Sequence, residues 1–319
     1  MVDSTQLAES KSIHRQTGKT FYYATRLLPE RVRHPTYVLY AFFRVADEVV
    51  DNPDGGLSPT EQHERLIEIR EAALGNEPTD DPVLEAFCEV RERYGIPDEE
   101  IEVFVDAMRT DIEKSRYETY DELESYMRGS AAAVGVMMSI VMETDDIDSA
   151  LPKARRLGEA FQLTNFLRDV GEDIADRDRI YLPQSTLEAC GADPADIERQ
   201  IFTDELGAAI GREMKRAEEL YREGVSGIKY LPSDCQLPVL TAAVLYADHH
   251  RLIRSHDNDT VTRTPSLGTL RKLALVAKTR LYWAWNDDPE AVFAKVSDVP
   301  MVEDDPTPRS RPGNPVPTG

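Results

Sequence analysis

The most informative segment of this 319-residue chain runs Gln162-Leu163-Thr164-Asn165-Phe166-Leu167-Arg168-Asp169-Val170-Gly171-Glu172-Asp173. Its polar residues Gln162, Asn165, Asp169 and Asp173 recur at three- and four-residue spacing between apolar neighbours, so they share one face of a predicted helix. Arg168 lies beside this polar stripe. A polar stripe in a core-like helix is unfavourable unless it meets water, a partner or a metal ion. The segment therefore predicts a helix that binds a ligand.

A second acidic pair stands earlier in the chain, in Arg44-Val45-Ala46-Asp47-Glu48-Val49-Val50-Asp51. Asp47 and Asp51 are one helical turn apart, about 6 Å along the axis, and Arg44 joins their face. Two carboxylates at this spacing repel each other, and a divalent cation would reverse that penalty. Mg²⁺ prefers carboxylate, phosphate and water oxygens, so two such helices facing each other would hold Mg²⁺ around a diphosphate. The alternative for either pair taken alone is a solvated helix face.

The chain is strongly acidic, with 59 Asp and Glu against 37 Lys and Arg and a formal net charge of -22. This charge repels phosphate backbones and argues against nucleic acid as a partner. Excess acid with few lysines suits a cytoplasm of high salt concentration, as in a halophilic archaeon, because salt screens the self-repulsion. An ordinary acidic protein is the alternative.

The three cysteines are scattered and form no CxxC pair. Neither a structural zinc site nor a disulfide framework is expected, and a reducing cytoplasm is the expected location. The polar first twenty residues show no signal-peptide pattern, and no run approaches the roughly 20 apolar residues that span a bilayer. A lipidic product would still draw the protein to a membrane surface as a peripheral protein. The sequence leaves the oligomeric state open.

Long segments with helical periodicity, separated by Pro, Gly and Asp turn signals, predict an all-α bundle. One predicted helix runs from Tyr120 to Glu143 and is rich in small residues, which indicates close helix packing or room for a ligand. Another runs without a break from Leu151 to Ile174. Residues 1–296 are expected to form one helical domain, and residues 297–319 a disordered, acidic, Pro-rich tail.

At these motifs the chain resembles the squalene/phytoene synthase family. Segment 162–173, followed by Arg179-Ile180-Tyr181-Leu182-Pro183, is similar to the family's second signature, and segment 40–51 is similar to its first. Segment 19–29 is similar to an N-terminal substrate-binding stretch, although Thr17-Gly18 stands where some members have His-Ser. The resemblance implies a single isoprenoid-synthase helical bundle with a central active-site cavity. It also implies a prenyltransferase reaction in two steps, through a cyclopropyl diphosphate.

The resemblance further implies a role for each site residue. Catalysis and binding of Mg²⁺, or of Mn²⁺ in its place, are expected of the four motif aspartates, Asp47, Asp51, Asp169 and Asp173. Asn165 is expected as a further metal ligand, and Tyr246 is expected to face the reacting carbons. Substrate binding is assigned to Lys19, Tyr22, Arg44, Tyr126, Gln162, Asn165, Arg168 and Arg179. Tyr22 is equally suited to core packing.

Within the family, the sequence looks most like the members that join two geranylgeranyl diphosphates head to head. Their product is phytoene, the first committed compound of carotenoid biosynthesis. The alternative is dehydrosqualene or squalene from two farnesyl diphosphates; squalene formation needs a nicotinamide cofactor, which is not expected here. Two other classes rank lower. One is a non-catalytic helical scaffold, and the other is a head-to-tail prenyltransferase, whose motifs begin with a doubled Asp that both pairs here lack.

Three predictions concern residues outside the acidic stripes. Adjacent His249 and His250 cannot both face one site, so a solvated helix end is preferred to a metal-binding pair. Trp283 and Trp285 are expected to pack the last helix. The basic residues of segment 177–179 are expected to form a lid over the diphosphate rather than to cap their helix.

Overall fold

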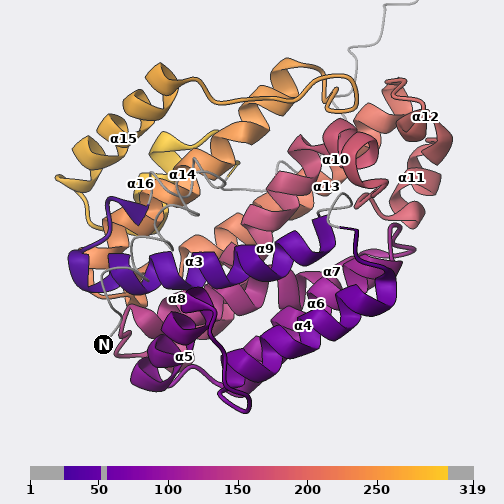
Figure 1. Ribbon diagram of the computed structural model, residues 1–319. Coiled ribbons are helices and arrows are strands. Elements are labelled where there is room, and N and C mark those ends of the chain that lie inside the picture. The colour runs from indigo at the N-terminus through magenta and orange to yellow at the C-terminus, as the bar shows by residue number, and fades with distance from the viewer. Residues whose placement is uncertain (1–24, 52–55, 301–319) are drawn as a thin grey trace, which may run out of the picture.

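The computed structural model describes residues 25–51 and 56–300, and in these ranges it is a bundle of helices without a β-strand (Figure 1). The prediction of an all-α fold is confirmed. The α-helices, labelled as in Figure 1, are α3 (Glu30–Asp51), α4 (Pro59–Leu74), α5 (Pro82–Tyr94), α6 (Asp98–Glu113), α7 (Tyr120–Met127), α8 (Ala133–Val141), α9 (Ile147–Arg168), α10 (Val170–Arg177), α11 (Gln184–Cys190), α12 (Pro194–Glu198), α13 (Asp204–Val225), α14 (Ser233–Ser255), α15 (Thr269–Trp283) and α16 (Pro289–Val296).

The helix ends follow the turn signals of the sequence. At the start of α4, Ser58 accepts a hydrogen bond from the backbone N–H of Glu61, and the Glu61 carboxylate accepts one from the Ser58 N–H at 2.7 Å. A cap of this kind contributes about 1 kcal/mol. The same helix ends at Gly75, whose φ of 75° is a left-handed conformation that glycine adopts without strain. Local sequence chemistry therefore sets these boundaries.

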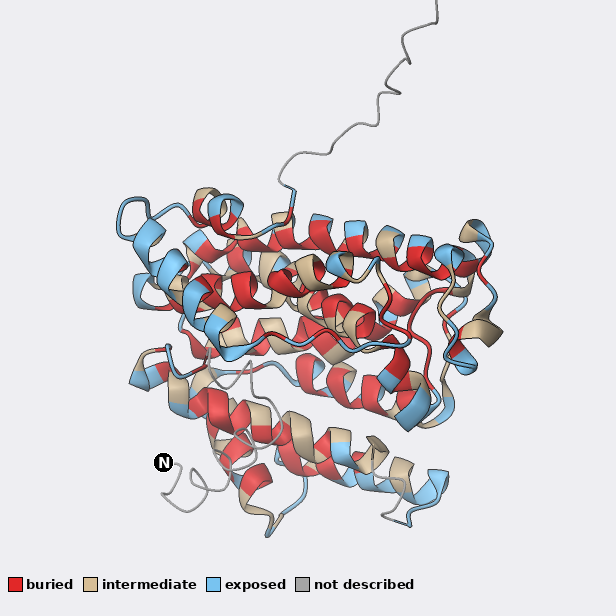
Figure 2. Ribbon diagram, turned by 90° about the horizontal axis from the view of Figure 1, so that it is seen from above, coloured by how far each residue is buried: buried red, intermediate tan, exposed pale blue. Residues whose placement is uncertain are grey.

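The long helix α9 lies at the centre of the bundle. It packs most extensively against α13 and α8, and it also contacts α14. Leu163 and Leu167 of α9 are almost completely buried, and Figure 2 shows such buried residues concentrated on the inner sides of the helices. The packed core therefore fixes the position of α9, including the face that carries the polar residues.

The predicted unbroken helix over residues 151–174 is wrong in one respect: α9 and α10 are separate helices that meet at Asp169. Asp169 has φ -105° and ψ 17°, outside the helical region. Just beyond it, the Gly171 N–H donates to the Thr260 carbonyl at 3.0 Å, and a Cβ on Gly171 would lie 2.1 Å from the Val261 carbonyl oxygen. The helix breaks because α10 packs against residues 260–261, which are distant in the sequence. The periodicity of the sequence does not predict such a break.

The small-residue segment is also divided, into α7, a π-helical turn (Arg128–Ala132) and α8. A Cβ on Gly135 would lie 2.4 Å from the Ala154 carbonyl oxygen, and one on Gly158 would lie 2.5 Å from that of Ala131. The glycines thus allow α8 and the π-helical turn to approach the backbone of α9 closely. Both glycines also line the cavities described below. The small residues of this segment therefore serve both close helix packing and the space for a ligand.

The last described helix, α16, ends at Val296, and residues 301–319 of the predicted tail lie outside the described residues. No helix in the described ranges combines the length and apolar character needed to cross a bilayer.

Candidate active site

A cavity of about 790 Å³ lies between the central helices and is bordered by residues of α3, α6, α9, α10 and α14. We call it the acidic cavity. Every predicted site residue within the described ranges lines it: Arg44, Asp47, Asp51, Tyr126, Gln162, Asn165, Arg168, Asp169, Asp173, Arg179 and Tyr246. The other two predicted residues, Lys19 and Tyr22, lie outside the described residues. The fold therefore brings the two acidic motifs together in one place.

Each acidic pair carries its own arginine. On α3, Arg44 forms a hydrogen-bonded ion pair with Asp47, one turn along the helix. At the junction of α9 and α10, the Arg168 Nε donates to Asp169 Oδ1 at 2.6 Å, and a second guanidinium nitrogen contacts the other oxygen. The break at Asp169 permits this side-by-side pairing, because neighbouring side chains in a continuous helix point apart.

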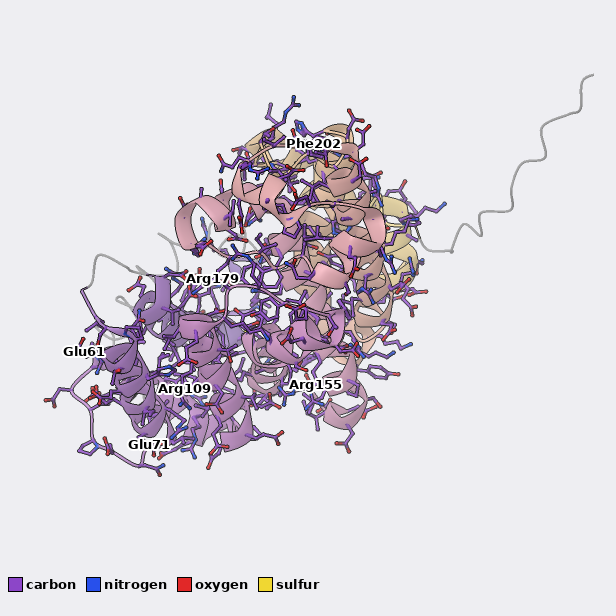
Figure 3. All side chains as sticks on the ribbon, turned by 90° about the vertical axis from the view of Figure 1, so that its right-hand side faces the viewer. Glu61, Glu71, Arg109, Arg155, Arg179 and Phe202 are labelled. Carbon is purple, nitrogen blue, oxygen red and sulfur yellow. The ribbon has the colours of Figure 1, made fainter. Side chains whose placement is uncertain are left out.

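Two further arginines, Arg177 and Arg179, contact the acidic pairs. Arg177 Nε lies 3.2 Å from an oxygen of Asp51, and Arg177 Nη1 lies 3.2 Å from Asp173. Arg179 Nη1 donates to Asp51 at 3.0 Å. Figure 3 shows Arg179 at the junction between the N-terminal helices and the central ones. The Arg177 guanidinium therefore bridges one carboxylate of each acidic pair, whereas Arg179 contacts the pair on α3.

The cavity raises the pKa of several carboxylates. Burial and the neighbouring Asp169 raise the pKa of Asp173 to about 7, although Arg177 opposes the shift. Burial and the neighbouring Asp51 likewise raise the pKa of Asp47, although Arg44 opposes it. Mutual repulsion of buried carboxylates is the condition that a bound cation relieves.

The donor set fits a divalent cation that is completed by substrate and water. No cluster of three or more His, Cys, Asp or Glu side chains forms a metal cage within residues 25–51 and 56–300. Mg²⁺ needs no such cage, because it usually takes one or two carboxylates and completes its shell with phosphate and water oxygens. The carboxylates here face a cavity that has room for both.

Asp111, at the end of α6, belongs to the site and was not predicted. Its Oδ2 accepts a hydrogen bond from the Tyr126 hydroxyl at 2.6 Å, and its backbone carbonyl accepts one from Arg179 at 3.0 Å. Its other oxygen, Oδ1, is buried and has no hydrogen-bond partner among the described residues. Burial raises the Asp111 pKa to about 7, against the effect of Arg179. Its position in the sequence could have indicated this role. Asp111 follows Phe104 and Met108 at helical spacing, so it is a single carboxylate on an otherwise apolar face.

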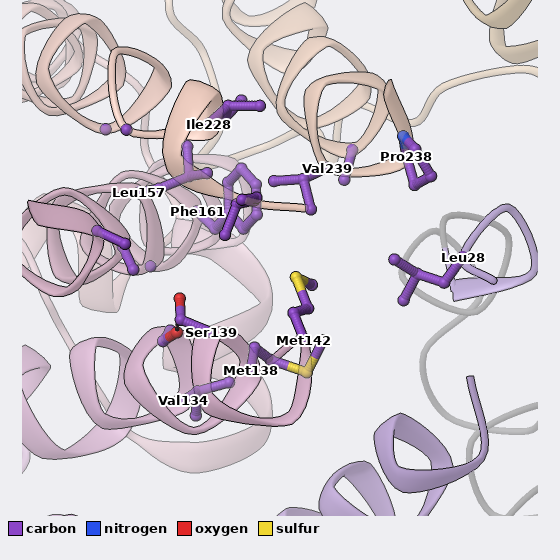
Figure 4. A pocket seen from close by; sticks show the side chains of 18 of the residues that line it. Leu28, Val134, Met138, Ser139, Met142, Leu157, Phe161, Ile228, Pro238 and Val239 are labelled. Atoms are coloured by element: carbon purple, nitrogen blue, oxygen red, sulfur yellow. Dashed lines mark hydrogen bonds between the residues drawn. The ribbon is translucent and has the colours of Figure 1, made fainter. Parts of the chain in front are cut away.

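A second cavity, almost entirely apolar, adjoins the first. It has a volume of about 120 Å³, and Figure 4 shows Met138, Met142, Leu28 and Val239 around it. We call it the apolar cavity. The two cavities have three lining residues in common: Val134, Gly158 and Phe161. A ligand with a charged head and a long hydrocarbon chain matches this arrangement.

Stacked aromatic rings line the acidic cavity, and one of them, Phe161, also lines the apolar cavity. Tyr246 stacks on Phe161 with ring centroids 4.5 Å apart, and Tyr181 stacks on Phe166 at 3.7 Å. Tyr126 lies beside Tyr181 at 5.9 Å. Aromatic faces attract cations electrostatically, so these rings are suited to a substrate that develops positive charge on carbon.

The prediction for the histidines of α14 is wrong, and the prediction for the tryptophans at the end of α15 holds for only one of them. The histidines 249 and 250 are not at a solvated helix end, because both are buried; His250 lies 3.0 Å from the Thr164 hydroxyl and 3.3 Å from Glu218. Partners on α9 and α13 enclose them, which no local pattern reveals. Trp283 packs against the core as predicted, but Trp285 is 86% exposed.

The fold and the cavity define an all-α enzyme that handles diphosphate substrates. Residues 14–274 match the sequence model of the squalene/phytoene synthase family. The chain is 33% identical to phytoene synthase of Rhodobacter capsulatus, over 88% of this chain and 83% of that one. It is 30% identical to 15-cis-phytoene synthase of Synechococcus elongatus, over 83% and 89% of the two chains. The chain belongs to the squalene/phytoene synthase family.

Solved structures agree with this membership. A crystal structure of a dehydrosqualene synthase in complex with a ligand superimposes with a TM-score of 0.78 and 28% identity, covering 88% of this chain and 98% of that one. The fold is also that of squalene synthase HpnC from Alicyclobacillus acidocaldarius, with a TM-score of 0.72, 24% identity and coverage of 80% and 95%. The protein is a prenyltransferase of a family that generally uses a divalent metal. A non-catalytic scaffold and a head-to-tail enzyme are set aside by this membership.

Proposed function

We propose that this enzyme condenses two molecules of geranylgeranyl diphosphate head to head, through a cyclopropyl diphosphate, to give phytoene. The names of the relatives favour this reaction within the family. The structural observation that carries the proposal is the pairing of the two cavities, one with carboxylates and arginines and the other apolar, which meet at Phe161.

We assign the metal ions to Mg²⁺, held by the two acidic pairs with Asn165 as a further ligand. Bound there, Mg²⁺ would supply positive charge that stabilises the diphosphate leaving group. The chain supplies the rest of the positive charge: Arg44, Arg168 and Arg179 line the same cavity and present planar guanidinium groups that bind phosphate oxygens in pairs. These arginines exchange their present carboxylate partners for the diphosphate.

The apolar cavity has two tasks in this proposal. Its side chains bind the hydrocarbon tails, at a gain of roughly 25 cal/mol for each Å² of apolar surface removed from water. They also keep water away from the allylic cation, which water would convert to an alcohol. Phe161 lines both cavities and stacks on Tyr246, which lines the acidic cavity, so we assign this pair to stabilising the allylic cation.

The test is a product assay with purified protein. With Mg²⁺ and geranylgeranyl diphosphate, we expect a C40 hydrocarbon with the chromatographic and spectral properties of phytoene. Omission of the divalent cation should abolish its formation. A C30 product from farnesyl diphosphate, with none from geranylgeranyl diphosphate, would overturn the choice of substrate.

A second candidate is the condensation of two farnesyl diphosphates to dehydrosqualene. It is favoured by the likeness to a dehydrosqualene synthase, which is 28% identical. Competition between the two diphosphates in one reaction, followed by product analysis, separates the candidates directly.

A further inference from the structure

The helix α15 presents an apolar stripe to solvent. Leu270, Leu273 and Leu281 are 84%, 61% and 62% exposed, and Trp285, two residues beyond the helix, is 86% exposed. With about 3.6 residues per turn, the three leucines fall on one face of the helix. The residues Ala274 and Ala277 on that face are exposed as well. The outward stripe of α15 therefore contains no polar side chain.

The opposite face of α15 packs the helix against the rest of the protein. Leu275 and Thr279 are buried against the rest of the protein, and Arg271 joins Asp248 of α14 through two hydrogen bonds of 2.5 and 3.1 Å. Figure 1 shows α15 at the outside of the molecule next to α14 and α16. Since core packing uses the inner face, it does not explain the leucines outside. Exposed apolar patches of this kind mark interaction sites.

The charge on α15 is opposite in sign to that of the whole protein. The helix contains four basic residues and no acidic one, in a chain of net charge -22. At helical spacing, Lys278 borders the apolar stripe on one side and Arg280 borders it on the other. Arg280 is exposed and has no ion-pair partner among the described residues. Leucines bordered by cations, with a tryptophan near the helix end, are typical of helices that lie in the surface of anionic membranes.

We propose that the outer face of α15 docks the enzyme on an anionic phospholipid surface. The leucines and Trp285 enter the boundary between headgroups and acyl chains, where tryptophan is enriched, and the cations meet the lipid phosphates. A second copy of the chain is a weaker match. Two copies of the chain, each of net charge -22, repel each other, and α15 offers no acidic residue to pair with the cations of a second α15.

The docking has a consequence for substrate supply that rests on the proposed function. The helix α14, on which α15 packs, lines the apolar cavity with Pro238, Val239 and Ala242. Attachment through α15 therefore holds the apolar cavity close to the membrane. The membrane interior dissolves the prenyl chains that this cavity binds. The docking itself is tested without any turnover.

The experiment uses the two tryptophans of the chain, Trp283 and Trp285, as an internal probe. The full-length Trp283→Phe variant leaves Trp285 as the sole indole. On addition of vesicles of phosphatidylglycerol, we expect its emission to shift to the blue and the protein to float with the vesicles. Vesicles of phosphatidylcholine should bind at least about tenfold more weakly, because they lack the net negative charge.

The matched variants separate the stripe from general surface effects. L273E/L281E should reduce binding to phosphatidylglycerol vesicles at least about tenfold, since two charges would have to enter the apolar boundary. L57E/I201E changes two leucine-sized residues that are 45% and 48% exposed elsewhere, and it should bind like the wild type. Both variants should form phytoene like the wild type when the substrate is given in detergent micelles. Absence of product from the wild-type protein in this assay would count against the proposed function and not against docking.

Two outcomes would overturn the proposal. One is an unchanged Trp285 emission in the presence of anionic vesicles. The other is a concentration-dependent dimer in light scattering that L273E/L281E abolishes, without flotation of the wild-type protein, which would assign the stripe to a second copy.

Discussion

The acidic cavity and the apolar cavity have lining residues in common, but their other lining residues differ in chemical character. Five carboxylates and four arginines line the first, and each ionic group there is held by a partner of opposite charge or by burial: Asp47, Asp51, Asp111, Asp169, Asp173, Arg44, Arg168, Arg177 and Arg179. The second is lined by apolar residues, several of them small, such as Ala154 and Ala242. We therefore expect the placed charges to determine the chemistry, and the small side chains of the apolar cavity to limit the length of the hydrocarbon chain.

The largest effect is expected from the acidic side. Asp169→Asn keeps the volume and removes the charge, so kcat should fall about 10²- to 10³-fold while the thermal midpoint changes little. Steady-state kinetics of diphosphate release measures this. Glu172→Gln is the matched control, because Glu172 lies between Asp169 and Asp173 in sequence but is exposed. Equal losses in both variants would contradict a specific role for Asp169.

The next effect concerns pH and Asp111. Its pKa is about 7 in the folded protein and about 4 when unfolded, so between these values the folded state binds the extra proton. The free energy of unfolding should therefore fall as pH rises from 4 to 7, by roughly 2–4 kcal/mol from this group. Urea unfolding of the metal-free protein should show a smaller fall for Asp111→Asn. The exposed Asp121→Asn is the control, and parallel profiles for Asp111→Asn and the wild type would refute the prediction.

A third test changes the apolar side alone. Ala242 of α14 lines the apolar cavity, so Ala242→Phe should shorten the space for the hydrocarbon chain. We expect kcat/KM for geranylgeranyl diphosphate to fall about tenfold or more relative to farnesyl diphosphate, as measured by competition. Ala208→Phe adds the same bulk at an exposed position of α13 and should leave the ratio unchanged. Equal losses with both substrates would show that Ala242 does not limit chain length.

The smallest effect should come from the face of α9 that meets neither cavity. Thr164 there donates to the Ala160 carbonyl at 2.7 Å, and its oxygen lies 3.0 Å from both Tyr221 and His250. Thr164→Val leaves these two groups without this partner, so the free energy of unfolding should fall by about 1–2 kcal/mol. Denaturant unfolding measures that fall. A change in kcat of more than about tenfold would show that the two faces of α9 are not independent.

Most of the fold and much of the site could be predicted because both depend on helical spacing. The stripes on α3 and α9 face one cavity because each recurs every three or four residues in an apolar setting. What could not be predicted depends on contacts distant in sequence. The break at Asp169 follows from the docking of Gly171 on Val261, and the burial of His250 follows from Glu218 on α13. In the sequence, Asp111 is one acidic residue among many. Only its contacts with Arg179 and Tyr126 in the folded protein identify it as part of the site.

The contact between Arg179 and Asp51 joins residues that are 128 positions apart in the chain. A ribosome that adds about 5–20 residues per second needs on the order of 10 s to make the intervening segment. During that time the nascent α3 has its acidic pair and Arg44, but not Arg177 at the end of α10 or Arg179 just beyond it. The end of α3 therefore acquires its full set of ionic partners only after more than half of the protein has been synthesised.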